Sequence, residues 1–167
     1  QQPKKNYFFG SLYDASEDGD LYDVIDALNS NGVDVNERGT GDGWTPLLIA
    51  CWNNHIEIVK ILLKRTDIQV NLAKDSGMTA LYIASSKGYV EVVRLLISKI
   101  DLDINKSTKY GCTALRIASF YGQVEVVRLL LSKSEIDINK KYKNTTPLAI
   151  ATIKGHTEIV KLLENHN

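Results

Sequence analysis

The sequence lacks the cysteines, the net charge and the long apolar runs that would assign it to a specialised class of protein. It contains only two cysteines in 167 residues, and its twenty Lys and Arg residues balance twenty Asp and Glu residues. Two cysteines cannot build a disulfide framework, and zero formal charge creates no global attraction to nucleic acid or anionic membranes. The longest apolar runs, such as Pro46–Cys51, fall far short of the roughly 20 residues of a membrane helix. A hydrophobic content of 44% fits one soluble domain.

No catalytic or metal-binding set of residues is evident. Neither His55 nor His156 lies within an HExxH motif or another metal-ligand spacing. Cys51 lies at an alanine-like position and is expected in the core, whereas Cys112 lies at a predicted loop tip and is expected to be exposed and to react first. We expect both thiols to stay unpaired, in a reducing compartment. The sequence therefore predicts that the protein is not an enzyme and that it binds no cofactor, no metal and no small-molecule substrate.

Two short segments imitate ligand-binding loops. Asp14–Asp20 places oxygen ligands at alternate positions, as a calcium-binding EF-hand loop does, but the twelfth position is Ile25 instead of glutamate. The glycine-rich segment Arg38–Gly43 lacks the GxxxxGK pattern of a phosphate loop. We therefore interpret the first as part of a helical unit and the second as a loop tip.

The chain is built from copies of one short unit. Four similar segments begin 34, 34 and 33 residues apart, and they are Gly43–Leu47, Gly77–Leu81, Gly111–Leu115 and Asn144–Leu148. A degenerate copy begins at Gly10. The first four copies also close with an asparagine 21 residues after a shared alanine, at Asn36, Asn71, Asn105 and Asn139. Such periodicity indicates a repeat architecture.

Each unit carries the signals of two short helices. The threonine of each segment can cap the start of a helix, and proline is tolerated at its first position. A second apolar stripe follows, with Ile58, Val59 and Leu62 spaced for one helical face. Two such helices cannot bury their apolar faces alone, so the units must stack into a solenoid.

At these residues the sequence resembles the ankyrin repeat family, whose pattern reads GxTPLHxAAxxGHxEIVKLLLxxGAxxN. The resemblance implies an all-α fold, an ankyrin-repeat solenoid of helix-turn-helix units joined by β-hairpin loops. We expect an N-terminal extension at residues 1–9 and one domain at 10–167. The five expected repeats are 10–42, 43–76, 77–110, 111–143 and 144–167.

The resemblance also implies a concave binding surface, formed by the hairpin tips and the exposed positions of each first helix. Carried over position by position, this surface is rich in aromatic side chains, which dominate protein interfaces. The expected partner-binding residues are Tyr13, Trp44, Leu48, Trp52, Asn53, Met78, Tyr82, Lys87, Tyr110, Arg116, Phe120, Tyr121 and Lys154. An alternative for some of them, Tyr82 above all, is packing between repeats.

Charge is unevenly distributed along the stack, with an acidic start at residues 1–42 and a basic middle. Asp20, Asp23 and Asp26 fit the solvated face of an N-terminal capping repeat. An alternative role for this acidic start is electrostatic steering of a polarised partner.

The leading functional hypothesis is a non-catalytic module that binds a protein or peptide partner through its concave face. We expect a cytoplasmic or nuclear monomer without membrane contact. A second hypothesis is a targeting segment of a larger enzyme or effector, because the chain begins with Gln1 instead of methionine. A third hypothesis, which we do not expect, is nucleic-acid binding through the basic middle region. It would use Lys106, Lys109, Arg116, Lys140, Lys141 and Lys143.

Overall fold

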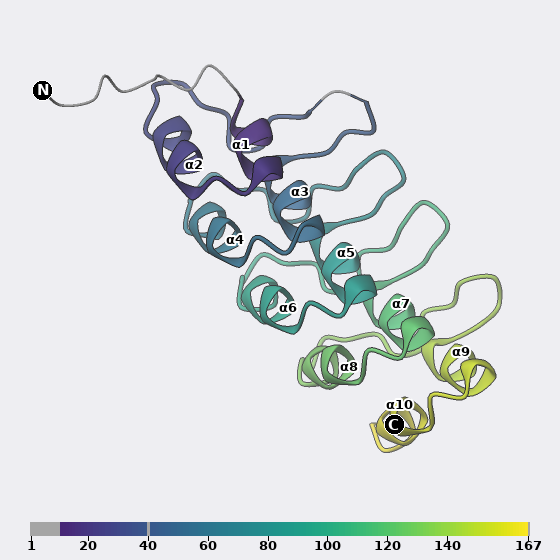
Figure 1. The fold of residues 1–167 in the computed structure, drawn as a ribbon. Helices are drawn as coiled ribbons and strands as arrows, with labels where there is room; N and C mark the ends of the chain where they lie inside the picture. Colours follow the sequence, from purple (N-terminus) through teal and green to yellow (C-terminus); the bar gives the residue numbers. More distant parts are fainter. Residues whose placement is uncertain (1–10, 40, 167) are drawn as a thin grey trace, which may run out of the picture.

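The fold is a regular stack of helix pairs, seen in a computed structural model that describes residues 11–39 and 41–166. Ten helices lie in these residues, and consecutive helices pair in an elongated solenoid with α1 and α10 at opposite ends (Figure 1). Their bounds are α1 (Leu12–Asp18), α2 (Leu21–Leu28), α3 (Pro46–Trp52), α4 (Ile56–Leu63), α5 (Ala80–Lys87), α6 (Val90–Leu96), α7 (Ala114–Tyr121), α8 (Val124–Leu131), α9 (Pro147–Lys154) and α10 (Thr157–Glu164). The expected extension at residues 1–9 lies outside the described part of the chain.

The helices form two parallel rows. The first helix of each pair (α1, α3, α5, α7, α9) lies in an inner row, and the second helix lies in an outer row (Figure 1). Long turns between one pair and the next project from the inner row, away from the outer helices. The resulting all-α solenoid of helix-turn-helix units is the predicted fold class.

The projecting turns are hairpin-like without forming strands among the residues that are described. Their extended pairing is limited to isolated bridges, Ala73 with Thr79 and Tyr142 with Thr145. In the last turn Lys143 and Asn144 both have positive φ values, 46° and 62°. Two such residues in succession are the mark of a tight two-residue hairpin.

Threonine begins four of the inner-row helices, as the repeat pattern predicts. The hydroxyl oxygen of Thr79 accepts a hydrogen bond from the Tyr82 backbone amide at 3.1 Å, and Thr113 does the same for Arg116 at 3.2 Å. This bond satisfies one of the amides that a helix start leaves free. Pro46 and Pro147 follow two of these threonines, at a position where a missing amide hydrogen costs nothing.

The turn between paired helices depends on a residue with positive φ. Gly122 ends α7 at φ 72°, and the ring of His156 from the next pair packs against it, with Nε2 3.1 Å from the Phe120 carbonyl oxygen. In the second pair this position is Asn54, at φ 59°. Asparagine is the residue other than glycine that most readily adopts this conformation.

Substitution of Gly122 by alanine is expected to lower the free energy of unfolding by about 2 kcal/mol or more. An added Cβ would sit 2.7 Å from Cε1 of His156, in addition to the strain of a positive φ. The control is Gly155→Ala, where φ is 74° and nothing lies within 4 Å, so that only about 1 kcal/mol of backbone strain is expected. Urea unfolding measures both, and equal losses would contradict the role assigned to the His156 contact.

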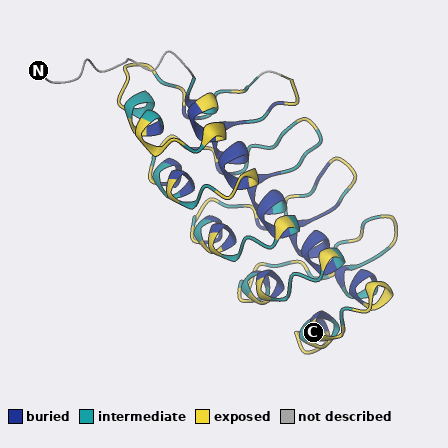
Figure 2. Ribbon diagram, viewed as in Figure 1, coloured by how far each residue is buried: buried dark blue, intermediate teal, exposed yellow. Residues whose placement is uncertain are grey.

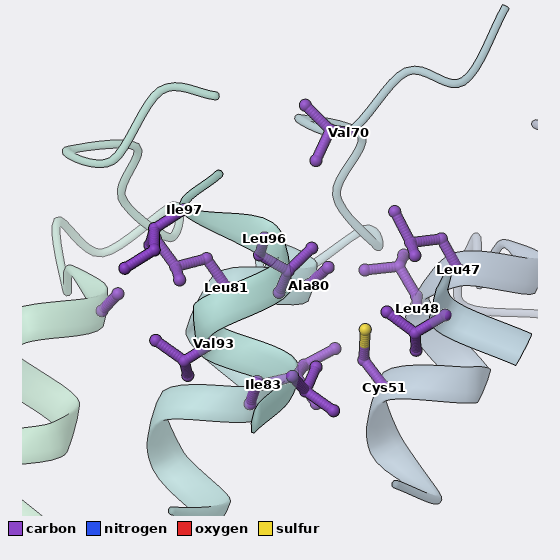
Figure 3. Close-up of a cluster of buried hydrophobic side chains, with 14 of the residues drawn as sticks. Leu47, Leu48, Cys51, Val70, Ala80, Leu81, Ile83, Val93, Leu96 and Ile97 are labelled. Atoms are coloured by element: carbon purple, nitrogen blue, oxygen red, sulfur yellow. The ribbon is translucent and has the colours of Figure 1, made fainter. Parts of the chain in front are cut away.

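One continuous core runs between the two rows of helices and from each pair to the next. Buried residues occupy the inner row and the inward faces of the outer row, while the outer faces are exposed (Figure 2). A close-up of the core shows side chains of α3, α5 and α6 meeting between neighbouring pairs (Figure 3). Each pair therefore buries its apolar surface against the next, as a solenoid requires.

The closing asparagine of a unit joins it to the following one. The amide of Asn71 donates to the Asp101 carbonyl at 2.6 Å, and its side-chain oxygen accepts from the Asp103 backbone amide at 2.8 Å. Asn36 and Asn105 make the same two bonds one unit away on either side. The constant spacing of these asparagines in the sequence thus corresponds to a repeated hydrogen-bonded link.

Candidate binding groove

Two adjoining hollows lie where the projecting turns meet the inner-row helices. One of ≈ 340 Å³ lies between the turns and helices α5 and α7, and a second of ≈ 430 Å³ extends toward α3. They share four lining residues, Met78, Tyr82, Ile117 and Tyr121. Because of this shared wall we treat both hollows as one feature, the hairpin–helix groove.

At the α3 end the groove carries two tryptophans. Trp52 lines the groove, and Trp44 packs edge-on against it with ring centroids 5.6 Å apart. The Lys87 ammonium lies 3.8 Å from the centroid of the Trp52 ring, and the Lys74 ammonium lies 4.6 Å from that of Trp44. These cation–π contacts hold the lysines over the aromatic faces.

At the α7 end the same combination of rings and cations recurs. Phe120 and Tyr121 pack edge-on at 4.9 Å, and the Lys154 ammonium lies 4.3 Å from the Phe120 centroid. The Arg116 guanidinium lies 4.4 Å from the centroid of Tyr142. The groove is thus an aromatic surface with positive charge along its whole length.

Arg116 is the one strongly buried cation of the groove among the residues described, with only 7% of its surface exposed. Its Nη2 donates to the Thr145 hydroxyl oxygen at 2.9 Å, and its Nη1 lies 3.6 Å from the Cys112 sulfur. Its Nε is buried and has no acceptor, and the same holds for the hydroxyl of Ser76, which lines the same hollow. The floor of the groove therefore holds polar groups whose hydrogen-bonding capacity is unused.

Tyr82 lies between the two hollows as a half-buried phenol. Burial is the main cause that raises its pKa well above the ordinary value, and the neighbouring Cys112 adds to the effect. The ring therefore stays neutral at physiological pH. It can offer a partner a hydroxyl group and an apolar face.

Most of the sequence-predicted binding residues lie on or beside the groove. Six of them are exposed, namely Trp52, Asn53, Lys87, Tyr110, Tyr121 and Lys154. Four are half-buried, namely Trp44, Met78, Tyr82 and Phe120. Tyr13 is half-buried on α1, where its backbone amide donates to a carboxylate oxygen of Glu37 at 2.7 Å. It lies on the inner row but does not line either hollow.

Three expectations about exposure are wrong, and the first is Arg116, which is only 7% exposed. Leu48 lies in the core between α3 and α5 (Figure 3), because every residue of α3 from Pro46 to Cys51 is buried by its neighbours. It offers no surface to a partner. Cys112, expected to be exposed at a loop tip, is only 5% exposed, because the turn folds back and places it beside Tyr82 and Arg116.

Several groove residues were missed by the position-by-position alignment. Three of them line the groove, namely Ser76, Ile117 and Tyr142. A fourth, Lys74, contacts the Trp44 ring. The turn that carries Tyr142 is one residue shorter than the preceding turn, so the ring has no aligned counterpart among the predicted positions. Only the approach of this turn to helix α7 in space brings the ring over Arg116.

The described residues hold no cluster of three or more His, Cys, Asp or Glu side chains that could bind a metal ion. Within that same part of the chain no helix is both long and apolar enough to cross a membrane. The chemistry that the groove does offer is aromatic contact, positive charge and hydrogen-bond donation.

Comparison with known proteins places this architecture in a family. No curated protein matches the sequence, but a family model for three copies of ankyrin repeats matches residues 12–108 and again residues 100–167. Repeats of this family are generally protein–protein interaction modules and are typically non-catalytic. Because the two matches together span residues 12–167, which contain all ten helices of the described structure, the chain belongs to the ankyrin repeat family.

Proposed function

We propose that this chain is a non-catalytic binding module that holds a protein or peptide partner in the hairpin–helix groove, on the concave side of the stack. The observation that carries this proposal is the row of paired rings along the groove, Trp44 with Trp52 and Phe120 with Tyr121. Tyrosine, tryptophan and arginine are the residues that contribute most to binding energy at protein interfaces.

The exposure of these rings supports a partner on this surface. Trp52, Tyr110 and Tyr121 are large apolar side chains that remain substantially exposed around the same hollows. Clustered exposed aromatics beside a concave surface are typical of interaction sites, whereas scattered ones are not. Each ring would bury a large rigid area against a partner with little loss of side-chain entropy.

Replacement of Tyr121 by alanine is expected to weaken partner binding by about 2 kcal/mol or more while leaving the thermal midpoint nearly unchanged. The ring is 55% exposed, so little folding energy depends on it. Trp52→Ala is expected to act in the same way. The partner is first captured from a cell extract by cross-linking to the parent protein, and its affinity for each variant is then measured by titration calorimetry.

The matched control is Tyr22→Ala on α2, because that ring is 61% exposed and lies on the outer row of helices. Its loss should leave the affinity for the captured partner at the parental value. If Tyr22→Ala and Tyr121→Ala bind equally well, recognition lies outside the groove. If the Trp52 or Tyr121 variant melts far below the parent, that ring belongs to the packing between repeats.

We further propose that residues 10–167 act as a single repeat domain and as a monomer. The continuous core between neighbouring helix pairs supports one cooperative unit. The two cysteines are free and buried, which fits a reducing compartment such as the cytoplasm or the nucleus.

A further inference from the structure

The two sides of the stack carry different charges. Helices α5, α7 and α9 and the turns at residues 105–113 and 139–146 contain eight lysine or arginine residues and no carboxylate. The cations are Lys87, Lys106, Lys109, Arg116, Lys140, Lys141, Lys143 and Lys154. The carboxylates of residues 76–166 are confined to the outer-row helices and the loops that follow them.

These eight cations are also unpaired. None of them forms a salt bridge in the described structure. Nearer the N-terminus the turn cations do have acidic partners: Lys74 lies 2.6 Å from Asp42, and Arg38 lies 3.5 Å from Asp75. Among the described residues, the groove side from α5 onward is therefore a basic surface without ion pairs, although the protein as a whole has zero formal charge.

Arg116 carries this asymmetry into the floor of the groove. A buried guanidinium normally faces a carboxylate, because removal of its charge from water is costly without one. Here the neighbours are a hydroxyl, a thiol and the Tyr142 ring, and Nε has no acceptor. The unused hydroxyl of Ser76 lines the same hollow. Both groups keep an unused donor hydrogen beside the hollow.

We propose that the groove selects an acidic peptide segment, in which an aspartate or glutamate side chain binds Arg116 and neighbouring apolar side chains pack against Met78 and Ile117. This inference rests on the proposed function and adds the chemistry of the partner. A carboxylate accepts two parallel hydrogen bonds from a guanidinium, which is the geometry in which arginine binds most strongly. The lysines at the rim attract the same segment at longer range.

The surroundings of Arg116 favour a peptide over a nucleic acid. The hollow that holds it is lined largely by apolar and aromatic side chains, among them Met78, Ile117 and Phe120. Phosphate contacts in nucleic-acid complexes come mainly from side chains and amides that reach outward to the backbone. A guanidinium at the bottom of an apolar hollow suits a single carboxylate on a flexible side chain.

The test uses two pools of short synthetic peptides, acetylated and amidated so that neither terminus is charged. One pool has aspartate or glutamate at alternate positions and apolar residues between them, and the other has asparagine or glutamine in place of each acid. Fluorescence anisotropy with the parent protein is expected to show about tenfold tighter binding of the acidic pool. A single-stranded RNA oligonucleotide is titrated in parallel.

Arg116→Gln is expected to lower the affinity for the acidic pool by about 30-fold and to leave the affinity for the amide pool unchanged. The control Arg94→Gln removes the same charge from an exposed position on α6 and should change neither affinity. Because Arg116 is buried, its substitution could also affect folding, and a second variant therefore changes only exposed residues. Lys87→Gln with Lys154→Gln, both exposed on the groove side, should weaken acidic binding, and Arg94→Gln with Lys161→Gln should not.

The acidic selectivity is overturned if the two pools bind with equal affinity, or if neither pool binds. Equal loss in the groove-side and outer-row double variants also overturns it, because it would indicate a response to net charge alone. RNA binding that is tighter than acidic-peptide binding and is lost in the groove-side variant overturns it in favour of nucleic acid. The proposed function itself is judged separately, by the effect of Tyr121→Ala on the captured partner.

Discussion

Cys51 is expected to react with a thiol reagent at least about a thousandfold more slowly in the folded protein than in the urea-unfolded chain. Its side chain has 0% of its surface exposed and points into the core beside Leu48, as Figure 3 shows. Burial also raises the pKa of the thiol far above its ordinary value, and only the thiolate reacts. Labelling must therefore wait for the helix pairs around α3 to separate.

Two single-cysteine variants separate the thiols. Cys112→Ala reports on Cys51 alone, and Cys51→Ala reports on Cys112, which is nearly buried but lines the groove. Cys112 should still be labelled first, because it lies beside an open hollow, although it too should be slower than in the unfolded chain. Mass spectrometry after timed quenching gives both rates. Rapid labelling of Cys51 in native buffer would mean that the stack opens near its centre.

Replacement of Leu62 by alanine is expected to lower the free energy of unfolding by about 2 to 5 kcal/mol. Leu62 is fully buried on α4, in the core between neighbouring pairs. Its truncation removes apolar contacts and leaves a cavity that rigid helices on both sides cannot fully close. Because each unit of a solenoid is stabilised by its neighbours, the loss should reach beyond one pair.

Urea unfolding followed by circular dichroism measures this effect, with Leu21→Ala as the control. Leu21 is the same residue type on an outer-row helix, but its side chain is exposed. The control should therefore lose no more than about 0.5 kcal/mol. A comparable loss in both variants would show that the two rows do not bury the core as described.

The binding surface illustrates where reasoning from position alone succeeds and where it does not. Trp52, Lys87 and Tyr121 lie on the groove because they occupy the end of a first helix, whose start a threonine caps in each unit. Leu48 occupies an equally regular position, but α3 is apolar throughout and is covered by its neighbours. Position in a repeat determines direction, whereas burial also depends on what packs in that direction.

By itself, the sequence determined the repeat period, the helix pairs and their stacking, because caps and apolar stripes act over a few residues and recur in every copy. The closing asparagines were visible as a pattern, but their bonds to the next unit appear only in three dimensions. Tertiary structure alone decided that Cys112 is buried and that Tyr142 covers Arg116. It also decided that no carboxylate meets that guanidinium. Arg116 on α7 and Thr145 in the turn that covers it lie 29 residues apart, and no local pattern encodes their approach.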